Sequence, residues 1–106
     1  MGYTHYWNLV ENAKPLSNKV IADLHKVFEL YIDILVYESG HADDLIYTNA
    51  RIRFNGEGEY GHETFYFSID ELDGFCKTAR KPYDIVVTIV LIILKKLLWR
   101  RYGNEL

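Results

Sequence analysis

The densest group of chemistry-bearing side chains in the sequence is a short cationic segment that precedes an apolar run. Lys77, Arg80 and Lys81 supply positive charge, Thr78 adds a hydroxyl donor, and Tyr83 can stack on a base or form a hydrogen bond. We expect the apolar run to be a helix. Backbone N–H groups and the dipole at a helix start favour phosphate or carboxylate, and so do cationic side chains. The segment therefore predicts a site for a small anion, with a solvated basic loop as the alternative.

Two histidines form the second group of candidate residues. His5 and His62 would act as general acid and base on a phosphodiester if their faces converged, because imidazole changes charge near neutral pH. The alternative is a structural role, in which each histidine caps an aromatic cluster. Neither histidine belongs to a motif with metal-ligand spacing, and Glu63 points to the opposite strand face from His62. We therefore expect no metal site, and we expect no cofactor.

Cys76 is the single cysteine of the chain. One cysteine excludes an internal disulfide and any zinc site built from several cysteines. The adjacent Lys77 can lower a thiol pKa, but a nucleophilic cysteine also needs a placed base. We expect Cys76 to be a small buried apolar residue beside Phe75.

Charge is divided unevenly along the chain. Residues 1–75 carry 5 Lys/Arg and 13 Asp/Glu, a net charge of −8, whereas residues 76–106 carry 7 and 2, a net charge of +5. The whole chain is only weakly acidic, at −3. A local basic region on an acidic protein attracts a small anion, while the remaining field repels a long polyanion. We therefore expect a nucleotide-like ligand and no long nucleic acid.

The segments that must position these groups have clear periodicities. Residues 2–9, 45–54 and 62–69 alternate between apolar and polar side chains, which predicts strands. Residues 18–38 carry apolar side chains at three- and four-residue steps, which predicts a helix with Ser17 as its N-cap.

A glycine-rich loop at residues 55–61 joins the second and third predicted strands into a hairpin. The apolar face of this hairpin would cover the first helix. The residues left on the second face are Arg51, Arg53, His62, Thr64 and Tyr66. Core or interface positions are the commoner use of aromatic side chains, but six of them can instead stack on a base. These are Tyr3, Tyr6, Trp7, Tyr47, Tyr60 and Tyr66.

The last apolar segment predicts a helix over residues 84–101, with Pro82 and Asp84 suited to its start. Its uncharged part, residues 85–94, is too short to cross a bilayer, which needs about 20 residues, so we expect a buried core helix and no membrane partner. The order strand, helix, strand, strand, helix predicts one α+β domain over residues 1–106. A small antiparallel sheet, the N-terminal strand plus the hairpin, would pack on two helices.

Three segments together resemble an uncharacterised family of small phage and bacterial proteins. They are GYTHYW at residues 2–7, FNG and GHETF within residues 54–65, and FCKTARKPYD at residues 75–84. The family has no established activity, so the resemblance carries over no catalytic residue. It implies a phage-linked context, and it groups six residues as a candidate site: His5, His62, Thr64, Lys77, Arg80 and Lys81.

These observations favour a non-catalytic protein that binds a small anionic, nucleotide-like ligand, such as a signalling nucleotide of bacterial antiviral defence. One alternative is an anti-CRISPR-like inhibitor that binds a host defence protein, with acidic residues 1–75 mimicking a phosphate backbone. Another is a phosphoesterase that uses His5 and His62, with Lys77 and Arg80 holding the phosphate.

Two expectations concern the setting of the protein. The N-terminal residues lack the basic and apolar regions of a signal peptide, so we expect a cytoplasmic protein, in the host cell if a phage encodes it. A domain of this size that is rich in tyrosine is also a candidate homodimer.

Overall fold

The computed structural model describes residues 3–10, 14–36, 45–71 and 73–95. In chain order the elements are β1 (Thr4–Asn8), α1 (Asn18–Leu30), β2 (Ile46–Tyr47), β3 (Arg51–Phe54), β4 (Phe65–Ser68), β5 (Asp73–Lys77) and α2 (Asp84–Ile93). Two short 3₁₀ helices, Ile32–Ile34 and Gly58–Tyr60, lie between them. The chain has a small α+β fold, as the sequence predicts.

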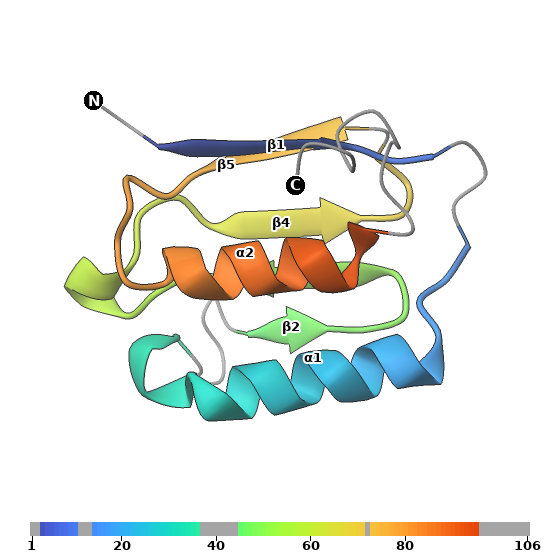
Figure 1. Ribbon diagram of the computed structural model, residues 1–106, viewed down its shortest axis with the longest axis horizontal. Coiled ribbons are helices and arrows are strands. Elements are labelled where there is room, and N and C mark those ends of the chain that lie inside the picture. The colour runs from blue at the N-terminus through green and yellow to red at the C-terminus, as the bar shows by residue number, and fades with distance from the viewer. Residues whose placement is uncertain (1–2, 11–13, 37–44, 72, 96–106) are drawn as a thin grey trace.

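The strands form two antiparallel sheets that lie edge to edge (Figure 1). β1 pairs with β5 in one sheet, and β2, β3 and β4 follow in that order in the other. The sheets meet beside β4 and β5, where the N–H of Glu63 donates to the carbonyl of Lys77 at 3.2 Å. The order across the strands is therefore β1, β5, β4, β3, β2.

β5 is an element that the sequence pattern does not predict. The sequence predicts no strand between residues 69 and 84, and it places the N-terminal strand in one sheet with the hairpin. In the structure residues 73–77 form a strand, and this strand is the partner of β1. Gly74 explains the error, because a Cβ at this position would lie 2.6 Å from the ring of Trp7. Inside this strand Gly74 lets the Trp7 ring lie close to the backbone. Because glycine also signals turns, the same residue is easily taken for part of a turn.

Both helices pack on the same face of the strands, with α2 crossing in front of them and α1 along the β2 side (Figure 1). Alternate residues of β3 and β4 are buried beneath them: Ile52, Phe54, Phe65 and Phe67. The ring of Phe54 stacks on that of Phe65 with centroids 4.9 Å apart, and Phe28 of α1 meets Phe54 at 5.3 Å. The alternation predicted for these two strands is confirmed, and burial of this aromatic core holds the layers together.

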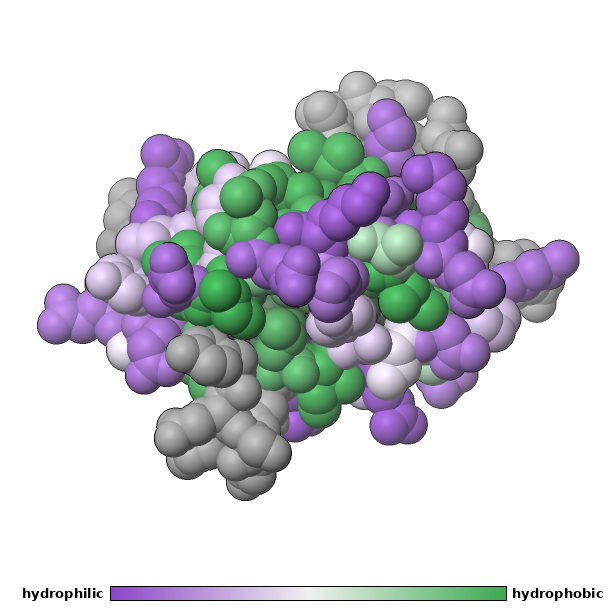
Figure 2. Space-filling view, turned by 90° about the horizontal axis from the view of Figure 1, so that it is seen from below, coloured by the Kyte–Doolittle hydropathy of each residue, from purple (hydrophilic) through white to green (hydrophobic). Residues whose placement is uncertain are grey.

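α1 begins where the sequence predicts and ends earlier. The side chain of Ser17 accepts the N–H of Val20 at 3.2 Å, as an N-cap does. Leu24 and Phe28 are buried in the predicted apolar stripe. The helix ends at Leu30 rather than residue 38, and residues 37–44 lie outside the described part. Figure 2 views the molecule from below, the side on which α1 lies in Figure 1. It shows hydrophilic side chains across the middle of that side, with hydrophobic ones between them.

The segment predicted as one strand at residues 45–54 is divided by a turn. The N–H of Thr48 donates to the carbonyl of Arg51 at 2.8 Å, and the Thr48 hydroxyl accepts the N–H groups of Ala50 and Arg51. A threonine side chain that binds nearby backbone in this way competes with the strand ladder. The result is two strands, β2 and β3, in place of one.

α2 is described over residues 84–93, so the predicted extension to residue 101 falls partly outside the described residues. Val86, Val87 and Val90 are buried against the strands, which confirms the expected core helix. Within the described residues no helix is long and apolar enough to cross a membrane.

Candidate functional site

The cationic segment is built around a tight turn just before α2. The N–H of Lys81 donates to the carbonyl of Thr78 at 2.9 Å, and the two central residues, Ala79 and Arg80, have φ values of 51° and 55°. Two successive positive φ values define a type I′ turn, which normally carries asparagine or glycine. Each such residue with a Cβ costs roughly 1–2 kcal/mol. Strain of this kind persists only where the surroundings hold it, and it is common at binding sites.

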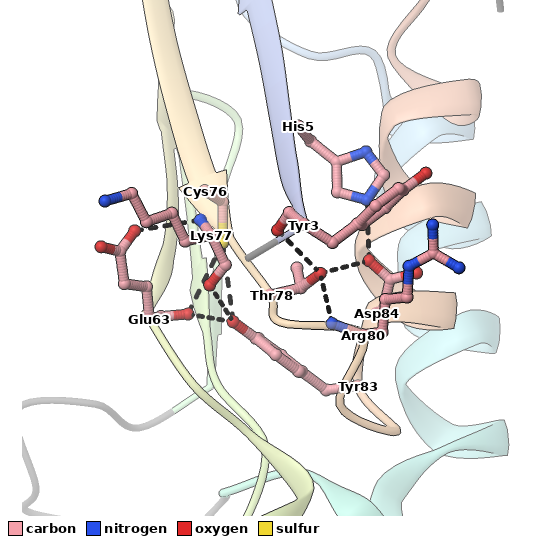
Figure 3. Close-up of polar contacts among 9 residues, drawn as sticks. All are labelled: Tyr3, His5, Glu63, Cys76, Lys77, Thr78, Arg80, Tyr83 and Asp84. Atoms are coloured by element: carbon pink, nitrogen blue, oxygen red, sulfur yellow. Dashed lines mark hydrogen bonds and ion pairs between the residues drawn. The ribbon is translucent and has the colours of Figure 1, made fainter. Parts of the chain in front are cut away.

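Thr78 and Asp84 hold the two ends of the turn. The N–H of Thr78 donates to the carbonyl of Tyr3 at 2.8 Å, and its hydroxyl donates to Oδ1 of Asp84 at 2.5 Å. The same carboxylate oxygen lies 2.8 Å from Nε2 of His5 (Figure 3). The Thr78 side chain is buried. Thr78, predicted as a direct ligand contact, is therefore a support of the turn in this structure.

The start of α2 differs from the expected site of exposed N–H groups. The N–H of Tyr83 donates to the carbonyl of Tyr60 at 3.0 Å, and that of Asp84 donates to the carbonyl of Lys81 at 2.8 Å. Pro82 has no N–H to offer. Asp84 also brings a negative charge to the first turn, where it complements the helix dipole. An anion at this place would consequently be held by cationic side chains rather than by the helix start.

Tyr83 lies in the interior below the turn. Its ring is fully buried, and its hydroxyl donates to the carbonyl of Glu63, with the carbonyl of Lys77 at 3.3 Å (Figure 3). The thiol of Cys76 lies 3.7 Å from the same hydroxyl. Burial raises the pKa of the Cys76 thiol to about 11, and burial also raises the pKa of Tyr83. Cys76 is the buried residue that the sequence predicts, and Tyr83 presents no surface on which a base could stack.

Arg80 is the cation that the turn presents most directly. Its side chain is exposed, and the guanidinium carbon lies 4.6 Å from the centroid of the Tyr3 ring. Tyr3 in turn meets His5 edge to face at 5.1 Å. Such a cation–π contact fixes the position of a guanidinium without consuming its N–H donors. Lys81, partly buried, follows it in the turn.

A groove of about 190 Å³ opens next to Tyr3, between β1 and the outer side of α2. Tyr3 and His5 line one wall, and Thr88, Leu91 and Ile92 line the other. Tyr3 is one of the aromatic side chains expected to stack on a base, whereas no role is predicted for Thr88, Leu91 or Ile92. The spacing of Thr88, Leu91 and Ile92 at three and four residues is the signal that could have placed them on one helix face.

The remaining predicted residues lie apart from this groove. The N–H of His62 donates to the side-chain oxygen of Asn55, and the side-chain amide of Asn55 donates to the Thr64 hydroxyl at 3.2 Å. His62 and Thr64 thus belong to the loop before β4, whereas His5 faces α2. The structure does not bring His5 and His62 together as an acid–base pair. Lys77 is exposed on β5, and its backbone N–H donates to the Glu63 carboxylate at 3.0 Å.

Metal binding finds no support in the described ranges, where no three His, Cys, Asp or Glu side chains are grouped as ligands. In comparisons with known proteins, no protein-family model, no curated protein and no solved structure matches this chain. The resemblance to small phage and bacterial proteins therefore stays a prediction, and the site rests on its own geometry.

Proposed function

We propose that the protein binds a small phosphate-bearing ligand of the nucleotide class at the turn before α2, without converting it chemically. The observation that carries this proposal is the Arg80 guanidinium held over the ring of Tyr3, a residue that also lines the adjoining groove. Arg80 and Lys81 would pair with the phosphate, and arginine can do so through two parallel N–H donors.

The groove is suited to the base of such a ligand. Its walls are mostly apolar and aromatic, with Thr88 and His5 as the polar groups within reach. Small-molecule sites commonly combine apolar walls with a few placed polar groups of this kind. A ligand with a flat aromatic part beside a phosphate would use both the groove and the cations.

The rigidity of the turn supports a binding role. Thr78, Asp84 and His5 fix the backbone on one side, and the Tyr3 ring fixes the Arg80 side chain on the other. A side chain that is already ordered loses less conformational entropy when a ligand arrives. The backbone strain at Ala79 and Arg80 accompanies the turn that places the Arg80 side chain over Tyr3.

Calorimetric titration with mononucleotides and cyclic oligonucleotides tests the proposal, with signalling nucleotides of antiviral defence as the first ligands to try. Arg80→Gly and Ala79→Gly form a matched pair, because both place glycine at a positive φ and only one removes the cation. We expect Arg80→Gly to weaken binding at least about tenfold, the loss of a charge-assisted pair. Ala79→Gly should stay within about threefold of the unmodified protein. Binding that is unchanged in Arg80→Gly, or absent across the panel, contradicts the proposal.

A further inference from the structure

The face of the strands opposite the helices carries the most exposed pair of neighbouring aromatic side chains in the described ranges. Tyr6 of β1 and Phe75 of β5 are direct cross-strand partners, with ring centroids 6.1 Å apart and planes inclined by 33°. Their exposed fractions are 68% and 55%. Large aromatic side chains side by side on a surface commonly mark a binding site.

The same face continues across the other strands as a transverse row. Tyr66 of β4 is the cross-strand partner of Arg53, whose guanidinium carbon lies 5.5 Å from the Tyr66 ring centroid. Ile46 of β2 is the next partner, opposite Arg53. We call these five residues the aromatic row: Tyr6, Phe75, Tyr66, Arg53 and Ile46.

Cationic side chains lie on both sides of the aromatic row. Lys77 follows Phe75 by two residues on β5, and Arg51 precedes Arg53 by two residues on β3, so side chains at these positions share the face. Since β4 runs antiparallel to β3 and turns back into β5, Lys77 and Arg51 fall on opposite sides of the row. Asp73, at the start of β5, is the acidic residue on this face of the strand.

Two shallow pockets on this face indicate how long a ligand bound there would be. One, of about 410 Å³, is lined by residues that include Tyr6, Asp73 and Phe75, and the other, of about 360 Å³, by residues that include Arg51 and Tyr66. Three strand spacings separate β1 from β3, about 14 Å in all. One nucleotide does not bridge such a distance, whereas a few linked nucleotides do.

We infer that this face binds a short single-stranded nucleic acid. Unpaired bases would stack on Tyr6, Phe75 and Tyr66, and phosphates would approach Lys77 and Arg51. Aromatic platforms combined with flanking cations are the usual means of binding single strands, and stacking tolerates any base. The net charge of −3 limits the attraction for a long polyanion, so the site suits a few nucleotides and depends on salt.

Fluorescence anisotropy with labelled oligomers of about eight thymidines or uridines tests this inference on the full chain. We expect Tyr6→Ser and Phe75→Ser each to weaken binding at least about tenfold, the loss of one stacked base. Leu30→Ser is the matched control, because it removes a side chain that is 74% exposed on α1, and it should leave affinity within about twofold. Asp73→Asn should strengthen binding, and added salt should weaken it.

Three results would overturn the inference: binding of neither oligomer, equal affinity for a duplex, or unchanged affinity in both aromatic variants. Self-association without nucleic acid that Phe75→Ser abolishes would show a second copy as the occupant instead, and would also overturn it. Arg80→Gly lies outside this face and should leave oligomer binding unchanged. That variant separates a failure of this inference from a failure of the nucleotide site.

Discussion

At the scale of single residues, Ala79 and Arg80 are the least expected feature of the site. Both adopt left-handed backbone conformations without being glycine or asparagine, and the turn they form aims Arg80 over Tyr3. Contacts of Thr78 with Tyr3 and Asp84 hold the turn in place. Local strain and distant support together fix the position of a cationic group.

This strain predicts that Ala79→Gly stabilises the protein. Glycine adopts a positive φ without a Cβ penalty, so we expect the free energy of unfolding to rise by about 1 kcal/mol. Urea denaturation measures the change. Ala22→Gly is the control, because Ala22 is exposed within α1 and glycine there should lower the free energy of unfolding by about 1 kcal/mol. Equal destabilisation by both substitutions would show that the turn is not strained.

Burial of the Cys76 thiol predicts a dependence of stability on alkaline pH. Its pKa rises from 9.0 to about 11 on folding, because burial disfavours the thiolate. Well below pH 9 the thiol is protonated in both states, whereas at higher pH the unfolded chain loses the proton first. The free energy of unfolding should therefore fall as pH rises from 9 towards 11.

Urea denaturation at pH values between about 9 and 10 reports mainly on the thiol, because tyrosine, with an ordinary pKa of about 10, is at most half ionised in the unfolded chain over this interval. In Cys76→Ala we expect the decline over this interval to be much smaller than in the unmodified protein. An identical decline in both proteins would assign the effect to other groups.

At the scale of the elements, the pairing of β1 with β5 is the decisive contact, because it brings His5 and Tyr3 to the turn before α2. Gly74 permits this pairing by leaving room for the Trp7 ring. Trp7 is nearly fully buried and meets Phe65 at 5.1 Å. The ring therefore has little freedom to move aside.

Gly74→Ala is predicted to destabilise the fold by about 1–3 kcal/mol, the usual range for overpacking. A Cβ at residue 74 would lie 2.6 Å from Trp7, well inside contact distance. A double-mutant cycle with Trp7→Phe, measured by thermal or urea unfolding, checks the cause. The smaller ring should make the loss from Gly74→Ala smaller, whereas strict additivity would place the clash elsewhere.

The sequence predicts the elements that follow a clear periodicity and misses those that depend on distant partners. The stripe of α1 and the alternation of β3 and β4 depend on local spacing, and the structure confirms them. The burial of β5 alternates but its residue types do not, since the apolar Phe75 is exposed between Gly74 and the buried Cys76. It forms a strand because the edge of β1 supplies a hydrogen-bonding partner, which is tertiary information.

The candidate site also combines features that the local sequence predicts with features that depend on distant partners. Arg80 and Lys81 could be predicted from charge density alone, but the support from Asp84 joins residues 79 positions apart in the chain. A type I′ turn with Ala and Arg at its centre has no sequence signal. For that reason Thr78 and Tyr83, which look like available hydroxyl groups in the sequence, are buried supports in the structure.

At the scale of the whole molecule, the turn that carries Arg80 and the exposed pair Tyr6 and Phe75 are separated in space. The turn with Arg80 lies at the start of α2, on the helix-covered side, whereas Tyr6 and Phe75 lie on the opposite face. The two proposed sites therefore use different sides of one thin layer of strands. A ligand at one should leave the other accessible.

The central claim is that a phosphate-bearing nucleotide occupies the turn and groove beside Tyr3. Backbone amide shifts in a ¹H–¹⁵N correlation spectrum, recorded during titration with a nucleotide selected by calorimetry, test it residue by residue. We predict the largest changes at Tyr3, His5, Thr88 and residues 78–81, with little change at Arg51 and Phe75. Changes confined to the opposite face, or none near Arg80, would contradict the account.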